Sequence, residues 1–250
     1  MDPLNAAAIR VPGVETRVVD RCASTNALLL AEAPRHPVLL AAEEQATGRG
    51  RRGRRWHSDP GAGVTFSIAR TMARSPGELS GLSLAVGVAA ARSLRALGVT
   101  RAELKWPNDL LVGGAKLGGI LIETRQRDGR TAVVVGIGIN CRPVPRLARR
   151  LRRRVAALDE HLPAPVSRNA VIGTVAREVL AALEAFERSG LAAFAADWAA
   201  LHAHEGKRLR VRLENGRTMS GVAEGIGKDG ALKLRTRTGL HSLRSARIIS

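Results

Sequence analysis

The strongest constraint on how this chain folds comes from one stretch, residues 48–56. It reads Gly-Arg-Gly-Arg-Arg-Gly-Arg-Arg-Trp, with three glycines, five arginines and one tryptophan. Glycine lets the backbone approach a ligand closely, arginine binds carboxylates and phosphates through paired hydrogen bonds, and tryptophan offers a flat face to a planar ring. Together these residue types predict a loop that binds a small anion carrying an aromatic base, such as a nucleotide. We call residues 48–56 the arginine loop.

Residues 48–53 also match the spacing G-x-G-x-x-G of dinucleotide-binding proteins. That interpretation requires a helix directly after the glycines and an acidic residue about 20 positions further on. Residues 54–61 instead read Arg-Arg-Trp-His-Ser-Asp-Pro-Gly, which predicts a turn, and position 73 is alanine. The pattern G-x-x-x-x-G-K-[ST] of P-loop proteins is absent from the sequence as well. Neither common class of nucleotide-binding fold fits.

Composition limits both the fold and the partners. A chain of 250 residues can form one sizeable core, or a main domain with a small appendage. Hydrophobic residues make up 45% and aromatic residues only 2%, so we expect a packed core of Ala, Leu, Val and Ile. The net charge of +18 indicates either a polyanionic partner or, as we favour, a general richness in solvated arginine. Net charge bears on association and not on fold.

The cysteines and the N-terminal sequence bear on location. Cys22 and Cys141 form no CxxC motif and have no histidine cluster nearby, which argues against a zinc site and suits the reducing cytoplasm. Residues 1–15 lack the basic start and apolar run of a secretory signal. No stretch of about 18 apolar residues appears, so we expect a cytoplasmic protein that does not span a membrane.

Hydrophobic patterning predicts strands and helices over the first 204 residues. We expect strands at residues 17–22, 37–44, 64–69, 103–112, 115–123 and 131–140, and helices at 27–33, 79–97, 169–188 and 191–204. Residues 75–78, Ser-Pro-Gly-Glu, predict a capping box ahead of the second helix. Pro107 predicts a bulge or bend in the fourth strand. The basic run at 149–154 fits a solvated helix face better than a polyanion site.

The pattern changes after the last predicted helix. Residues 206–250 show short alternating segments separated by turn signals, such as Asn-Gly at 215–216. This alternating pattern predicts a separate small β domain. We therefore divide the chain into a first domain at residues 1–204 and a second at residues 205–250.

Three further stretches combine polar groups or glycines with predicted strands. Residues 105–109 read Lys-Trp-Pro-Asn-Asp, residues 116–119 read Lys-Leu-Gly-Gly, and residues 136–140 read Gly-Ile-Gly-Ile-Asn. A lysine beside a glycine pair can reach a ligand that presses on bare backbone, yet each stretch alone has an ordinary structural explanation. Ser24 and Thr25 likewise suit the N-cap of a helix, and that position is compatible with ligand binding.

Four motifs, taken together and in this order, resemble those of the biotin–protein ligases, or biotin–[acetyl-CoA-carboxylase] ligases: GRGRRGRRW, KWPNDL, KLGGILIE and GIGIN. Residues 24–26, Ser-Thr-Asn, and residues 44–45, Glu-Gln, stand where that family has matching residues. Residues 225–232 resemble its C-terminal domain, so the resemblance covers nearly the whole chain. Only about 16 residues precede the first expected strand, which suggests the form that lacks an N-terminal DNA-binding domain.

The resemblance implies an α+β fold. A mixed β-sheet with helices on one side, similar to class II synthetase catalytic domains, would be followed by a small C-terminal SH3-like β-barrel. The implied enzyme activates biotin with ATP as biotinyl-5′-AMP and transfers it to a lysine of a biotin carboxyl carrier protein. Biotin, ATP and Mg²⁺ are the implied ligands. The implied partner is the carrier domain of an acyl-CoA carboxylase, without DNA operator binding, and the implied state is a monomer or a homodimer.

The resemblance also implies the catalytic residues. Lys116 and Arg51 would bridge the biotin carboxylate and the α-phosphate, where positive charge offsets the repulsion between two anions. Asp109 is the implied metal ligand or, with Asn108, would position the incoming lysine, and the backbone at 118–119 would line the biotin slot. The full set implied for ligand binding is Ser24, Thr25, Asn26, Gln45, Arg49, Gly50, Arg51, Arg54, Trp56, Asn108, Asp109, Lys116, Gly118, Gly119 and Asn140.

Within that set, different residues would bind the two ends of the biotinyl-5′-AMP intermediate. Ser24, Thr25 and Gln45 would hold the ureido ring of biotin, Trp56 would stack on adenine, and Asn140 would contact the nucleotide. We expect the arginine loop to be mobile without ligand and to order over the adenylate, excluding water.

Two other functions compete with this one. The related lipoate ligases share the implied fold, so transfer of lipoate or octanoate is one alternative, although the arginine loop does not mark that group. A nucleic-acid-binding module is the other. It would explain the arginines but not the combination of Gln45, Lys116 and Asn140.

Overall fold

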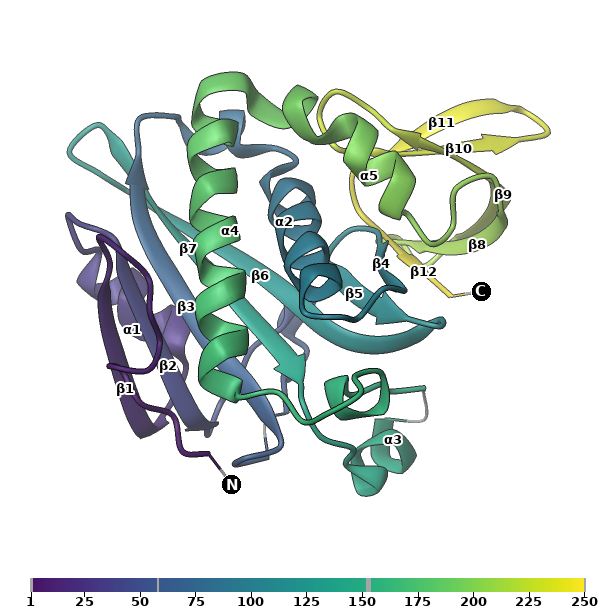
Figure 1. Ribbon diagram of the computed structural model, residues 1–250. Coiled ribbons are helices and arrows are strands. Elements are labelled where there is room, and N and C mark those ends of the chain that lie inside the picture. The colour runs from purple at the N-terminus through teal and green to yellow at the C-terminus, as the bar shows by residue number, and fades with distance from the viewer. Residues whose placement is uncertain (1, 58, 152–153, 250) are drawn as a thin grey trace.

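The computed structural model describes residues 2–57, 59–151 and 154–249, which form two β-sheets and their covering helices (Figure 1). The strands are β1 Glu15–Cys22, β2 Val38–Gln45, β3 Gly63–Met72, β4 Ala102–Lys105, β5 Asp109–Val112, β6 Ala115–Arg127, β7 Arg130–Asn140, β8 Arg208–Leu213, β9 Thr218–Ile226, β10 Leu232–Thr236, β11 Gly239–Leu243 and β12 Ala246–Ile248. The α-helices are α1 Thr25–Glu32, α2 Leu82–Ala96, α3 Pro145–Leu151, α4 Arg168–Ser189 and α5 Ala195–Leu201.

The first sheet is mixed, as the family resemblance implies. Its seven strands run in the order β1-β2-β3-β7-β6-β5-β4, with β1 and β2 parallel and every other pairing antiparallel. The long strands β3, β7 and β6 form its centre, where runs such as Val133–Val135 suit a sheet buried on both faces. The predicted mixed sheet with helices is therefore confirmed.

The side chains of β2 show how the helices cover this sheet. Leu39 and Ala41 point into the main core, whereas Val38 and Leu40 join a smaller core with Leu29 of α1. Alternate residues of a strand face opposite sides of a sheet, so the two cores lie on its two faces. In Figure 1, α2 and α4 lie over one face and the short helix α1 covers the other. The expectation of helices on one side holds for α2 and α4 but not for α1.

The segment around Pro107 bends more sharply than predicted. Lys105 pairs with Asp109 across an antiparallel hairpin, so the chain reverses between β4 and β5 instead of bulging within one strand. The Trp106–Pro107 peptide bond is cis. Asn108 Nδ2 donates to Ile120 O at 2.7 Å, which fixes the turn against β6.

The capping box is present but caps a different element. The Ser75 amide and hydroxyl both donate to the Glu78 carboxylate, at 2.9 and 2.7 Å. They frame a short 3₁₀ helix, Pro76–Leu79, and α2 begins only at Leu82. Gly81 separates the two with φ of +83°, a left-handed angle that favours glycine.

The second sheet is open within the described residues. Its strands run β11-β10-β9-β8-β12, all antiparallel, and no pairing joins β11 to β12 there. The expected closed barrel is thus not confirmed, although the expected β-rich C-terminal region is. The Trp106 indole Nε1 donates to Gly230 O at 3.0 Å and links this sheet to the first one. The division at residues 204 and 205 remains a prediction.

The basic run lies at the end of α3. Arg149 is exposed there, and Arg150 Nη2 lies 3.1 Å from His57 Nδ1. Arg152 and Arg153 lie outside the described residues, so the prediction for the whole run remains open. Among the helices that the structure describes, none is both long enough and apolar enough to span a membrane.

Candidate active site

A cavity of about 800 Å³ lies between the arginine loop, the first sheet and the last strand of the second sheet. Its lining includes these residues of the predicted set: Ser24, Thr25, Asn26, Gln45, Arg49, Gly50, Arg51, Arg54, Trp56, Asn108, Asp109, Lys116 and Gly119. The fold therefore gathers residues from separate motifs around one space. A cavity of this size falls in the range of small-molecule sites.

A buried chain of polar groups lies at one side of the cavity. Gln45 Oε1 accepts hydrogen bonds from the Thr25 amide at 2.7 Å and from Thr25 Oγ1 at 3.1 Å. Thr25 Oγ1 lies 2.6 Å from Ser67 Oγ, which donates to Asn26 Oδ1 at 2.6 Å. Ser24 caps α1 by accepting from the Ala27 amide at 3.4 Å. Buried polar groups that bond one another hold a fixed arrangement.

The same chain of polar groups continues to the arginine loop. Asn26 Nδ2 donates to Glu123 Oε2 at 2.9 Å, and Arg49 Nη2 lies 3.1 Å from Glu123 Oε1. A Cβ atom on Gly136 would lie 2.2 Å from Asn26 Oδ1, so glycine there gives the amide its space. Glu123 thus connects the polar pocket to the loop.

Lys116 lies at the centre of the site. Its ammonium forms an ion pair with Asp109, and both side chains are mostly buried. Lys116 Nζ lies 5.9 Å from the centre of the Trp56 ring. A Cβ atom on Gly119 would lie 3.2 Å from the same Nζ atom. The ammonium therefore lies over bare backbone and beside an aromatic face, where a charge acts more strongly than in water.

Trp56 lies against the sheet. A Cβ atom on Gly138 would come within 2.3 Å of the indole ring, so only glycine leaves room for this packing. The indole Nε1 is buried and has no hydrogen-bond partner among the described residues. A buried donor without a partner is costly and is commonly reserved for a ligand or a water.

Two predicted residues do not line the cavity. A Cβ on Gly118 would meet Gly138 O, Leu110 and Ile139, on the core side of β6. Asn140 Nδ2 donates to Ala156 O at 3.0 Å and to Lys116 O at 3.4 Å. In this structure both residues support the strands that carry the site.

The arginine loop concentrates positive charge. Burial of the Arg51 guanidinium is the largest cause that lowers its pKa, repulsion from Arg52 and Arg54 adds to it, and Asp109 partly opposes it. Arg52 has a left-handed backbone (φ 57°, ψ 43°) and its guanidinium contacts Ser245 Oγ. The loop therefore presents several positive charges to an anion, and its backbone at Arg52 is strained. Its tip also contacts the second sheet.

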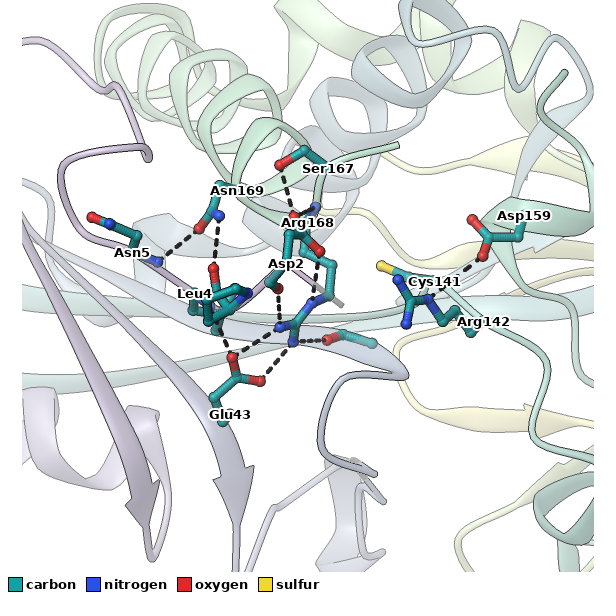
Figure 2. Close-up of polar contacts among 12 residues, drawn as sticks. Asp2, Leu4, Asn5, Glu43, Cys141, Arg142, Asp159, Ser167, Arg168 and Asn169 are labelled. Carbon is teal, nitrogen blue, oxygen red and sulfur yellow. Dashed lines mark hydrogen bonds and ion pairs between the residues drawn. The ribbon is translucent and has the colours of Figure 1, made fainter. Parts of the chain in front are cut away.

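A buried arginine holds both ends of this loop region (Figure 2). Arg168, at the start of α4, is 2% exposed and donates to both carboxylate oxygens of Glu43, at 2.6 and 2.9 Å. Its Nη1 also donates to Gly63 O at 3.4 Å, and its Nη2 to Asp2 O at 2.5 Å. Glu43 precedes the arginine loop and Gly63 follows it. Hydrogen bonds from Arg168 hold the pKa of Glu43 below its ordinary value.

The donor set of the cavity bears on metal binding. Within residues 2–57, 59–151 and 154–249, no group of three or more His, Cys, Asp or Glu side chains is placed to hold a metal ion. The Asp109 carboxylate is already engaged by Lys116. The described protein groups do not form a metal cage of their own.

Comparison with known proteins agrees with this geometry. Residues 18–140 match the biotin/lipoate A/B protein ligase family, and residues 204–249 match the biotin protein ligase C-terminal domain. The biotin–[acetyl-CoA-carboxylase] ligase of Mycobacterium tuberculosis is 37% identical over 225 residues, which cover 87% of this chain and 82% of that protein. The chain belongs to the biotin protein ligase family.

Other members of the biotin protein ligase family extend the comparison. The bifunctional ligase/repressor BirA of Escherichia coli is 36% identical over 198 residues, covering 77% of this chain but only 60% of BirA. The solved structure of the Aquifex aeolicus biotin protein ligase in complex with biotin and ATP superposes with a TM-score of 0.79 at 25% identity. That match covers 94% of this chain and 97% of the other.

Sequence patterns did not find three residues that support the site through hydrogen bonds without lining the cavity. Ser67 stands in a strand that reads as alternating, Glu123 ends a motif of apolar residues, and Arg168 begins a helix far from the loop. Alternation with Val64, Phe66 and Ile68 places Ser67 on the polar face of its strand, so nothing in the sequence indicated that Thr25 and Asn26 of α1 would bury it. Glu123 ends one of the four motifs but was given no role, and Arg168 offered no local signal, because their partners Asn26 and Glu43 are distant in sequence.

Proposed function

We propose that this protein is an ATP-dependent ligase that activates biotin as biotinyl-5′-AMP and transfers the biotinyl group to a lysine of a carrier protein. One observation supports this most: a single cavity combines a fixed polar pocket, a partly buried lysine and an arginine loop. The first feature suits a small polar ring, and the other two suit the anions that must react. Membership of the family supports the same reaction.

The polar pocket favours biotin over lipoate or octanoate. A ureido ring presents two N–H donors and one carbonyl, which matches the hydroxyl and amide groups of Ser24, Thr25 and Gln45. A dithiolane ring or an alkyl chain could not form hydrogen bonds with these groups. Sites built to bond a polar group discriminate strongly against analogues that lack it. Biotin is therefore the substrate we propose.

The basic groups fit the adenylation step. A carboxylate oxygen of biotin attacks the α-phosphorus of ATP, the bond to the bridging oxygen breaks, and pyrophosphate leaves. Both reactants are anions, so Lys116 and Arg51 would stabilise the negative charge that accumulates between them. Trp56 would stack on adenine and satisfy its unpartnered indole group in that complex. Asn140 would act through Lys116, whose carbonyl it already holds.

The transfer step needs an amine free of its proton. The lysine nitrogen of the carrier attacks the acyl carbon of the adenylate, AMP leaves with the bonding pair, and the nitrogen loses a proton. Asp109 is the carboxylate that we propose to guide the incoming ammonium, supported by Asn108 at the same turn. The backbone at Gly119 would line the path of the biotin chain, with Gly118 behind it.

Mg²⁺ enters the proposal only with the nucleotide. This ion usually keeps several waters and binds phosphate oxygens with one or two carboxylates. That preference fits a cavity without a metal cage, and Asp109 is the carboxylate that would contact Mg²⁺ during adenylation, before the carrier lysine enters. Mg²⁺ would neutralise the triphosphate, and the protein groups would do the orienting.

Partner and location follow from the same chemistry. We propose the carrier domain of an acyl-CoA carboxylase as acceptor and the cytoplasm as location, where ATP is present and thiols stay reduced. Cys22 and Cys141 are both free, in keeping with that compartment. The protein would work as a monomer or a homodimer.

Intact-protein mass spectrometry of a purified carrier domain tests the proposal. Incubation with this protein, biotin and ATP is expected to add one biotinyl group to the carrier, and omission of ATP to add none. Replacing biotin by lipoate or octanoate serves as the matched substrate control. Transfer of those acids instead of biotin would assign the protein to the alternative activity.

A further inference from the structure

The first sheet splits where the arginine loop leaves it. The last pair that joins β2 to β3 among the described residues is Ala41 with Phe66. Beyond that pair, β2 continues beside β1 as far as Gln45, and β3 continues beside β7 as far as Gly63. Residues 46–62, which contain the arginine loop, connect these two ends. We call the opening between residues 41–45 of β2 and residues 63–66 of β3 the strand fork.

The strand fork borders the active-site cavity on both of its sides. Gln45 lines the cavity from the end of β2, and Thr65 and Phe66 line it from β3. Gln45 also belongs to the buried chain of polar groups, through its hydrogen bonds with Thr25. The spacing of the strand fork therefore sets where the arginine loop begins and ends relative to the cavity.

The Arg168 side chain spans the strand fork from outside the cavity. Its Nη1 donates to Glu43 Oε2 at 2.6 Å on one side and to Gly63 O at 3.4 Å on the other. Its Nη2 donates to Glu43 Oε1 at 2.9 Å. A guanidinium presents its donors in a rigid plane. One buried side chain can therefore hold the two strands at a set separation, which a lysine ammonium on its flexible stem cannot do.

Glu43 joins the same link to the chain on both sides of the loop (Figure 2). Its Oε1 accepts from the Leu4 amide at 2.8 Å, and a hydrogen bond from the Gly61 backbone helps to lower its pKa. Gly61 lies where the chain returns from the arginine loop, six residues before the start of the paired part of β3 at Ser67's side of the fork is complete. Arg168 Nη2 also donates to Asp2 O at 2.5 Å. The N-terminal segment thus braces the link from behind.

Attachment of α4 to the sheet does not require this link. Arg70 joins β3 to the same helix through ion pairs with Glu184 at 2.9 Å and Glu187 at 3.2 Å, and it does not line the cavity. A buried ion pair such as Arg168 with Glu43 adds little stability over an apolar contact of similar size. What the pair at the strand fork adds is a fixed geometry at the two ends of the arginine loop.

We propose that Arg168 is a positioning residue that keeps the strand fork closed, so that the arginine loop retains biotinyl-5′-AMP until the acceptor lysine arrives. This inference rests on the proposed function, in which a labile mixed anhydride must be kept from water. A loop whose ends are held in place loses less conformational freedom when it orders over a ligand. Arg168 acts through Glu43 and Gly63, because its own side chain does not line the cavity.

Hydrolysis of the intermediate in the absence of an acceptor tests this proposal. Water attacks the acyl carbon of escaped or exposed biotinyl-5′-AMP, and biotin and AMP form, so AMP production with biotin and ATP alone measures the leak. We expect Arg168→Lys, which keeps the charge but cannot span the strand fork, to raise the leak per adenylate formed by about tenfold, because small displacements at a site have large effects. Arg70→Lys is the matched control and should change the leak by no more than about twofold.

Trypsin gives a second readout that does not depend on turnover. The arginine loop contains five cleavage sites, and mass spectrometry identifies cuts within residues 49–55. With biotin and ATP present, we expect the loop to be protected in the unaltered protein and in Arg70→Lys, but to be cut in Arg168→Lys. Both measurements are made at a temperature where circular dichroism shows all variants folded. Glu43→Gln weakens the same link from its other partner and should act in the same direction, whereas Glu44→Gln should not.

The outcomes separate this inference from the proposed function. Equal leaks and equal cleavage in Arg168→Lys and Arg70→Lys would overturn the inference, because Arg168 would then only stabilise the fold. A raised leak with an intact, protected loop would also overturn it, since the adenylate would escape by another route. Absence of biotin-dependent pyrophosphate release from the unaltered protein would contradict the function instead. Protection of the loop by ATP and Mg²⁺ alone, compared between the two lysine variants, would still decide the role of Arg168.

Discussion

The ammonium of Lys116 and the carboxylate of Asp109 form an ion pair over the bare backbone of Gly119. The two residues come from neighbouring strands, and Asp109 pairs with Gly119 in the register of β5 and β6. The sheet thereby fixes a positive charge at the middle of the cavity. Anionic reactants would compete with Asp109 for that charge, which leaves the carboxylate available to an incoming amine.

Removal of the Lys116 charge is expected to abolish most adenylation. Lys116→Met keeps much of the side-chain volume and should lower biotin-dependent pyrophosphate release by about 100- to 1,000-fold, the usual loss for one transition-state charge contact. Biotin affinity should change far less, because the polar pocket that we propose for the ureido ring lies elsewhere. The control is Lys228→Met at an exposed turn. Release within threefold of the unaltered rate would contradict the role of Lys116.

Substitutions at two glycines of β7 should affect the two ends of the cavity separately. Gly136→Ala would displace Asn26 and weaken biotin binding, since the new Cβ lies 2.2 Å from its Oδ1. Gly138→Ala would displace Trp56, at 2.3 Å, and raise the KM for ATP. Gly77→Ala is the control, because nothing lies within 4 Å of its Cβ position. Calorimetric titration with each ligand checks the result, and an effect of both changes on the same ligand would refute this separation.

Substitution of Ser67 tests whether the buried chain of polar groups contributes to biotin binding. Ser67→Ala leaves Asn26 Oδ1 without this donor and is expected to weaken biotin binding by about 1 kcal/mol, or roughly fivefold. Ser93→Ala removes another buried hydroxyl, which donates to Ala89 O within α2, and should alter stability alone. Biotin dissociation constants of the two variants decide the matter. Equal constants would mean that Ser67 only supports the fold.

The pairing of Glu43 with Arg168 predicts a stability that depends on pH. Because hydrogen bonds from Arg168 lower the pKa of Glu43 below its ordinary value of 4.5, the folded state binds the proton less well than the unfolded state. This contribution is complete above pH 4.5 and is lost as pH falls through the folded pKa. Glu43→Gln should reduce the acid dependence of urea unfolding.

The same substitution has an expected cost at neutral pH. Glu43→Gln leaves the buried Arg168 guanidinium without its main counter-charge, which costs about 3 kcal/mol. Glu44→Gln, at the next and more exposed carboxylate of β2, is the matched control. A pH profile that is the same for both variants would show that Glu43 does not carry this dependence.

Local composition explains only part of what could be predicted from the sequence. The arginine loop is unusual by itself, whereas Gln45 and Lys116 were indicated by the resemblance of their motifs to a family, and the fold brings all of them to one cavity. The bend at Pro107 was expected, but the full reversal between β4 and β5, with its hydrogen bond from Asn108 to Ile120, was not.

Residues whose role depends on distant partners were harder to predict. Ser67 acquires its role from Asn26, 41 positions earlier, and Arg168 from Glu43, 125 positions earlier. Asn140 is the opposite case, a residue whose sequence motif suggested a ligand contact that the structure does not show. Its motif suggested a nucleotide ligand, yet the fold uses its amide for the carbonyls of Lys116 and Ala156.

The most direct test of the account is pyrophosphate release with ATP, in the presence and absence of biotin. The account predicts release that requires biotin, saturates with it and is not supported by lipoate or octanoate. Release that ignores biotin, or that responds to those acids instead, would contradict the assignment of this cavity to biotin adenylation.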